Sequence, residues 1–120
     1  MLQTLFRVSF LLVLAAALYA GLKAQPVPQV VSHFDLILHF GAFATLSVLW
    51  VLGFPRRWWL PGLTFLLFLG AGIELWQGWA LPGRTASLVD MAANASGVAA
   101  GFVLALLFRV IDRVNFRHKN

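Results

Sequence analysis

Polar side chains that could do chemistry occur at the ends of three otherwise apolar stretches of the sequence. Seven residues share this placement, and an eighth, Arg84, lies in the loop that joins two of the stretches. The seven are Asp35, His39, Glu74, Gln77, Ser87, Asp90 and Asn94. Within each stretch they are three or four residues apart, which places them on one face of an α-helix. Carboxylates and an imidazole can exchange protons with a ligand, and a guanidinium can bind a phosphate or carboxylate. The residue types therefore indicate a polar binding site or an acid–base site, with all eight as candidate ligand contacts.

Three of these residues, His39, Glu74 and Asp90, are the candidates for a catalytic acid or base. Together with Asp35 they could ligate a hard or borderline metal ion. The chain has no H-x-x-x-H or H-E-x-x-H motif, however, so we expect neither a metal nor another cofactor. A Ser-His-Asp arrangement that includes Ser87 can be written down, but it lacks a nucleophile elbow.

The composition indicates a protein that resides in a membrane. Of the 120 residues, 61% are hydrophobic and 11% are charged, against about 45–50% and about 25% in soluble domains. The mean hydropathy is +0.86. The absence of cysteine excludes disulfides, zinc–thiolate sites and thiol nucleophiles. The net charge of +5 could suggest nucleic acid, but the basic residues lie at segment ends, which is typical of membrane orientation signals.

Four apolar segments are close to the roughly 20 residues that span a bilayer as a helix. They cover about residues 5–22, 34–54, 58–79 and 87–111, and a basic tail follows at 112–120. Because the connections are short, we expect successive helices to be antiparallel. The fold class is therefore all-α: a single polytopic membrane domain over residues 1–120, built as an antiparallel bundle of four transmembrane helices. The first segment also resembles a secretory signal peptide, although Lys23 stands where a cleavage site should be uncharged.

The distribution of lysine and arginine predicts the orientation. Seven of the nine lie on the side of the termini, and two lie on the other side, Lys23 and Arg84. Both termini are therefore expected in the cytoplasm. In this orientation the candidate site residues lie near the outer face, whereas the inner halves of the segments are almost entirely apolar. This one-sided polarity favours a pocket that opens outward over an ion path through the membrane.

The fourth segment contains two helix-packing signals. Ser87 and Asp90 form a capping box, S-x-x-D, in which Asp90 could serve only the helix terminus. Gly97 and Gly101 form a G-x-x-x-G motif, which allows another helix to approach closely. That helix could belong to the same chain or to a second copy. Asn94, one turn before Gly97, could bond across this contact or bind a ligand.

The order of the polar residues is similar to that of the VanZ-like family of small bacterial membrane proteins. D-x-x-x-H opens one segment at Asp35, and E-x-x-Q closes a later one at Glu74. The pattern P-G-R-x-x-S-x-x-D-x-x-x-N-x-x-G then occupies residues 82–97, with all seven defined positions in register. The family often has lysine after the first aspartate, where this chain has Leu36, which leaves Arg84 as the nearest basic residue.

The resemblance covers about residues 26–101 and implies a bacterial cytoplasmic-membrane protein. The founding member of the family is linked to low-level resistance to the glycopeptide teicoplanin. The family's biochemical activity is not established. Our first hypothesis is an outward pocket that binds or modifies a cell-envelope component, either lipid-linked or related to peptidoglycan. The alternative is an accessory protein, without enzymatic activity, whose polar cluster only fixes helix packing and which docks onto an envelope enzyme. The expected partners are otherwise membrane lipids, with no nucleic acid.

Overall fold

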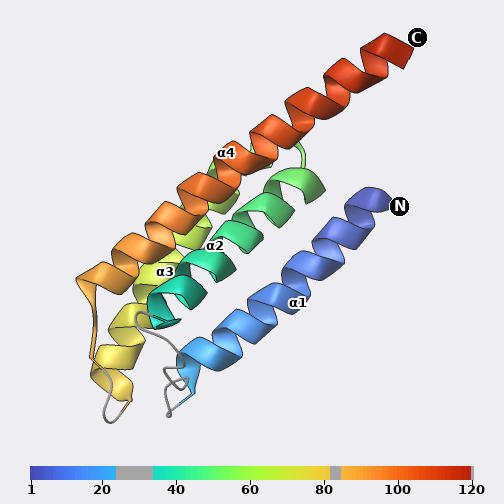
Figure 1. Cartoon of the computed structure of the whole chain (residues 1–120). Helices are drawn as coiled ribbons and strands as arrows, with labels where there is room; N and C mark the ends of the chain where they lie inside the picture. Colours follow the sequence, from blue (N-terminus) through green and yellow to red (C-terminus); the bar gives the residue numbers. More distant parts are fainter. Residues whose placement is uncertain (24–33, 82–84, 120) are drawn as a thin grey trace.

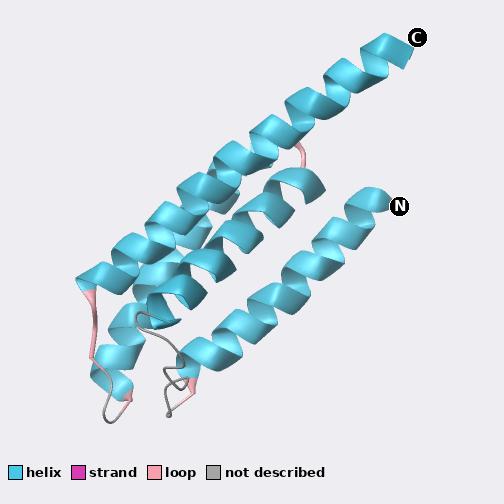
Figure 2. Cartoon of the chain, in the orientation of Figure 1, coloured by secondary structure: helices cyan, strands magenta, loops and turns pink. Residues whose placement is uncertain are grey.

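The computed structural model describes residues 1–23, 34–81 and 85–119. All regular secondary structure in these residues is helical (Figures 1 and 2). The elements are α1 (Leu2–Leu22), α2 (Phe34–Gly53), the short 3₁₀ helix η1 (Arg56–Trp58), α3 (Trp59–Ala80) and α4 (Leu88–Lys119). The all-helical prediction is confirmed. Within the described residues, four helices are long and apolar enough to cross a membrane.

The helices lie along the long axis of the molecule, and the two termini lie at the same end (Figure 1). At about 1.5 Å per residue, α1, α2 and α3 are each about 30–33 Å long, close to the thickness of a bilayer's hydrocarbon core. The helix α4 has 32 residues, or about 48 Å, and extends past the other helices (Figure 1). Residues 112–119, expected as a basic tail, thus continue this helix.

The largest helix contact joins α2 and α4, and it depends on the two glycines of the G-x-x-x-G motif. A Cβ atom at Gly97 would lie 2.5 Å from the carbonyl oxygen of Phe40, and one at Gly101 would collide with the carbonyl oxygen of Ala44. The Ser47 hydroxyl also donates a hydrogen bond across this contact, to the Val98 carbonyl at 2.8 Å. The motif therefore packs against α2 of the same chain.

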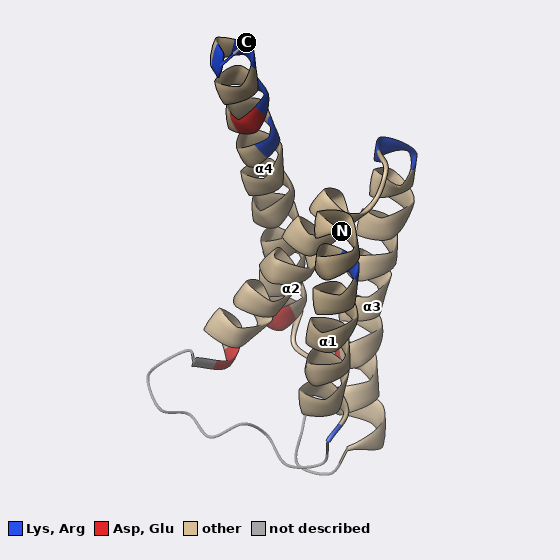
Figure 3. Cartoon of the chain, turned by 90° about the vertical axis from the view of Figure 1, so that its right-hand side faces the viewer, with Lys and Arg blue, Asp and Glu red and all other residues tan. Residues whose placement is uncertain are grey.

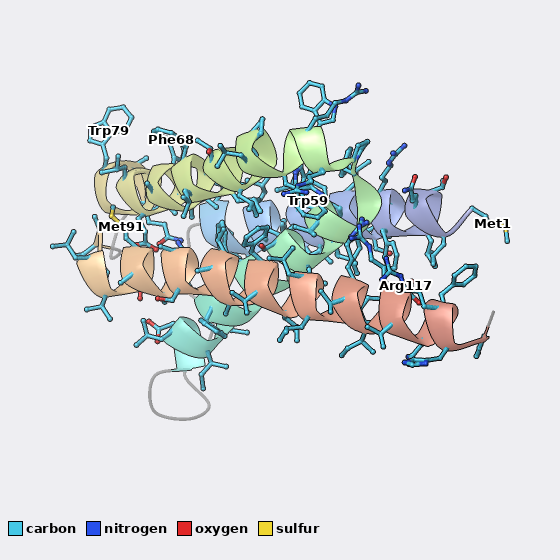
Figure 4. The ribbon with its side chains drawn as sticks, turned by 90° about the horizontal axis from the view of Figure 1, so that it is seen from above. Met1, Trp59, Phe68, Trp79, Met91 and Arg117 are labelled. Atoms are coloured by element: carbon cyan, nitrogen blue, oxygen red, sulfur yellow. The ribbon has the colours of Figure 1, made fainter. Side chains whose placement is uncertain are left out.

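Apolar side chains fill the centre and also cover much of the outside. The buried cluster consists of Phe10, Phe43, Leu46, Leu66, Ile73 and Val98. On the outer surface, Phe68 is 75% and Trp79 86% exposed, and both point away from the other helices (Figure 4). An apolar exterior of this kind is compatible with a bilayer as the surrounding solvent.

Two arginines cap the C-terminal end of α2. Arg7 of α1 donates from Nε to the Gly53 carbonyl at 2.7 Å, and Arg109 of α4 donates from Nη2 to the Val51 carbonyl at 2.6 Å. The last carbonyls of a helix lack intrahelical partners and carry partial negative charge, so cations stabilise this end. Sequence analysis treated these arginines only as orientation signals. Their packing role could not be predicted, because the sequence does not show which carbonyls they reach.

Candidate functional site

Three helices bring His39, Glu74 and Asp90 together near the end opposite the termini. His39 Nε2 of α2 lies 3.6 Å from Glu74 Oε1 of α3 and 3.9 Å from Asp90 Oδ2 of α4. The Glu74 side chain is fully buried, whereas those of His39 and Asp90 are 16% and 15% exposed. In Figure 3 the acidic start of α2 lies in this half, while most basic segments lie at the other end. The three catalytic candidates thus form one cluster, which is accessible through two of its members.

Asn94 fixes the orientation of the His39 ring. The amide nitrogen of Asn94 faces the Gly70 carbonyl at 3.4 Å, so its Oδ1 points the other way, to His39 Nδ1 at 2.8 Å. Because an amide oxygen only accepts hydrogen bonds, Nδ1 of His39 must carry a proton. Gly70 permits this arrangement, since a Cβ atom there would lie 3.1 Å from Asn94 Nδ2.

It follows that the second ring nitrogen of His39 is directed at two carboxylates. With the proton on Nδ1, a neutral imidazole would present a lone pair at Nε2. A protonated ring would instead present an N–H donor at Nε2 to the same two carboxylates. The ligand atoms of His39, Glu74 and Asp90 all lie within 4.8 Å of one another. The three groups are therefore close enough together for the proton exchange that general acid–base chemistry requires.

The start of α4 is capped differently from the predicted capping box. Ser87 Oγ accepts the Asp90 N–H at 3.1 Å, which confirms Ser87 as the N-cap. The Ser87 N–H, however, donates to Glu74 Oε2 of α3 at 3.1 Å. The carboxylate that completes the cap thus comes from another helix, while that of Asp90 faces His39. Asp90 therefore does more than finish its own helix.

Replacement of Ser87 by alanine should lower the free energy of unfolding by about 1 kcal/mol, because the Asp90 N–H loses its acceptor. Thermal or denaturant unfolding in detergent would measure this change. The Ser87→Thr variant is the control, since its hydroxyl can occupy the same place. Equal destabilisation of both variants would contradict a capping role for the hydroxyl.

Gln77 and Asp35 are two other predicted site residues that the structure describes. Gln77 is buried, and its Nε2 donates to the Gly21 carbonyl of α1 at 2.9 Å, so it links α3 to α1. Asp35 is in the first turn of α2, one turn before His39, and it is not in the group of close ligand atoms among the described residues. Arg84 lies outside the described residues.

The same three groups could hold a divalent cation, since each offers one ligand atom within the 4.8 Å group. Imidazole nitrogen and carboxylate oxygen are ligands that several divalent ions accept. The metal-free site expected from the sequence therefore remains a prediction.

The residue that sequence analysis missed is Gly70, whose carbonyl orients the Asn94 amide. The spacing in the sequence could have indicated this residue. Gly70 lies four residues before Glu74, one helical turn away on the same face of α3, and it is buried.

Comparisons of the chain with protein families, with curated proteins and with solved structures found no match. The resemblance to the VanZ-like family thus depends on the motif residues alone.

Proposed function

We propose that this chain is a VanZ-like integral membrane protein of the bacterial cytoplasmic membrane. Its four apolar helices form an antiparallel bundle that crosses the bilayer, as one membrane domain with both termini in the cytoplasm. Two observations support this topology. The apolar helices are long enough to span the hydrocarbon core, and seven of the nine lysines and arginines lie on the side of the termini.

The proposed role of the His39–Glu74–Asp90 cluster is to bind or modify a cell-envelope component that is lipid-linked or related to peptidoglycan. The observation that carries this proposal is the approach of His39 Nε2 to two carboxylates, at 3.6 and 3.9 Å. The cluster lies within about 10 Å of the outer ends of its helices at about 1.5 Å per residue. Ionisable groups at such a depth are costly, which makes them functional candidates.

In this role each residue has a distinct task. His39 would accept or release a proton at Nε2, because Asn94 holds the proton at Nδ1. Glu74, which is fully buried, would stabilise the positively charged imidazolium. Asp90 is partly exposed and would contact the ligand together with His39. Arg84 is the proposed cation for a phosphate or carboxylate of the ligand.

The second candidate function is that of a structural or accessory protein that docks onto an envelope enzyme. The observation that favours it is the number of polar bonds between helices in the cluster. The Ser87 N–H bonds Glu74, and Asn94 bonds both His39 and the Gly70 carbonyl. Bonds of this kind can fix the register of α2, α3 and α4 without binding any ligand.

The pair Asp90→Asn and Asp112→Asn tests the proposed function. Both carboxylates belong to α4, but Asp112 is exposed near its far end. In a strain that lacks the gene, D112N should restore teicoplanin tolerance to the wild-type level, whereas D90N should leave it at that of the deletion. The reason is that D90N removes a charge beside His39 but keeps the backbone N–H that Ser87 caps.

The membrane content of each variant is measured in parallel. Loss of tolerance in D90N at wild-type protein content supports the pocket. Wild-type tolerance in D90N would contradict a ligand role for Asp90, and a loss that follows the loss of protein would favour the structural alternative.

A further inference from the structure

A second polar feature lies at the opposite end of the molecule, where α4 passes the start of α3. A surface cavity of about 280 Å³ opens there. Its lining includes three arginines and three large apolar side chains: Arg56, Arg109, Arg113, Trp59, Phe102 and Leu106. One part of the cavity is therefore strongly cationic and the other apolar.

A hydrogen bond and ring contacts position the residues that line this cavity. Trp59 donates from Nε1 to the Phe54 carbonyl at 3.0 Å and contacts the Phe102 ring edge-to-face at 6.1 Å, between α3 and α4 (Figure 4). The Arg109 guanidinium lies over the Trp59 ring at 5.2 Å, and its Nη2 donates to the Val51 carbonyl. Arg109 uses only Nη2 in its hydrogen bonds, although a guanidinium has five N–H groups.

The arginines around the cavity are not held in ion pairs within the part of the chain that the structure describes. Among the described residues, Arg56, Arg109 and Arg113 form no ion pair with a carboxylate. Arg56 and Arg113 are exposed, and Arg113 follows Arg109 by one helical turn on the same face of α4. Three guanidiniums around one cavity repel one another, and a bound anion would relieve this repulsion.

The position of the cavity along the bundle indicates which anion. From Leu88 to Arg109, α4 rises about 32 Å at about 1.5 Å per residue, and a bilayer's hydrocarbon core is about 30 Å thick. In the proposed topology the arginines therefore lie at the inner boundary of the core, with apolar lining residues towards the lipid tails. Tryptophan at this level is typical of the membrane interface.

We propose that this cavity binds one anionic phospholipid of the inner leaflet. Its phosphate contacts Arg56, Arg109 and Arg113, and an acyl chain lies against Trp59, Phe102 and Leu106. The inference depends on the proposed membrane insertion but not on the proposed role of the His39 cluster, which lies at the other end of the helices.

The test compares two double variants that remove the same charge. Arg56→Gln with Arg113→Gln changes the rim of the cavity, whereas Arg57→Gln with Arg117→Gln changes two exposed arginines that do not line it. Arg109 is left intact because it caps α2. Native mass spectrometry of the detergent-solubilised protein, titrated with dioleoyl phosphatidylglycerol, gives the dissociation constant. Dioleoyl phosphatidylcholine serves as the neutral lipid.

We expect the wild-type protein to prefer phosphatidylglycerol over phosphatidylcholine. The R56Q/R113Q variant should bind phosphatidylglycerol about 30-fold more weakly, since each arginine near an anionic lipid surface raises the affinity about fivefold. The R57Q/R117Q variant should bind as the wild type does. Millimolar inorganic phosphate should not displace the lipid, because phosphate has no acyl chain. Equal weakening of the two double variants, no weakening of R56Q/R113Q, or displacement by phosphate would each overturn the proposal.

The thermal unfolding of both variants is measured in the same detergent. If R56Q/R113Q unfolds below the assay temperature, R113Q alone replaces it, with an expected weakening of about fivefold. The Asp90→Asn variant should bind phosphatidylglycerol normally. Lipid binding tests the cavity and teicoplanin tolerance tests the His39 cluster, so a result that contradicts one proposal leaves the other unaffected.

Discussion

Replacement of Glu74 by glutamine should abolish the proposed function and spare the fold, whereas replacement by alanine should damage both. In E74Q the amide oxygen can still accept the Ser87 N–H, and the amide nitrogen can donate to His39 Nε2. We expect its free energy of unfolding within about 1 kcal/mol of the wild type. In E74A the Ser87 N–H loses its partner and a cavity remains, at a cost of about 1–3 kcal/mol.

The two variants separate the candidate functions when unfolding in detergent and teicoplanin tolerance are both measured. If the cluster binds or modifies a ligand as proposed, it requires the negative charge beside His39, and E74Q should show the tolerance of the deletion strain. If the cluster only fixes helix register, E74Q should be as tolerant as the wild type and only E74A should fail. Wild-type tolerance in a stable E74Q protein is therefore the result that contradicts a ligand-binding role.

The substitution Gly101→Ala should destabilise the fold by about 1–3 kcal/mol, the cost typical of overpacking. The added methyl group would collide with the Ala44 carbonyl oxygen and lie 2.9 Å from Ser47 Cβ, so α2 and α4 would have to separate. The loss of the Ser47 hydrogen bond to Val98 would add to this cost. Denaturant unfolding in detergent measures the change.

The control for this experiment is Gly72→Ala. A Cβ atom at Gly72, on the exposed side of α3, has nothing within 4 Å. Alanine is also the better helix former, so G72A should be neutral or more stable by up to about 1 kcal/mol. Equal effects of G101A and G72A would show that close packing at Gly101 contributes nothing.

Apolar length and residue spacing were sufficient to predict the helices and much of the candidate site. Segments of about 20 apolar residues can satisfy their backbone groups only as helices in a membrane, and the four predicted segments match the four observed helices. His39, Glu74 and Asp90 were expected at one depth, and the structure brings them within 4.8 Å. The N-cap role of Ser87 was also predicted correctly.

The sequence could not show which partner each polar group reaches. Gln77 shares the spacing of the site residues, yet it bonds a backbone carbonyl of α1. The Ser87 N–H could have bonded Asp90, its neighbour in the capping box, but Glu74 of α3 accepts it. The partner that each polar group reaches depends on the rotation of each helix about its axis and on the axial shift between neighbouring helices. The spacing of residues along the sequence does not contain this information.

The hydrogen bond from Asn94 to the Gly70 carbonyl makes the protonation pattern of His39 sensitive to the position of α3. Movement of α3 along α4 by one residue, about 1.5 Å, would withdraw the carbonyl that orients the Asn94 amide. The amide could then rotate and offer a donor to His39 Nδ1 in place of an acceptor. The imidazole proton would transfer to the nitrogen that faces the carboxylates. A displacement of α3 along α4 by one residue would thereby exchange the donor and acceptor nitrogens of the imidazole ring.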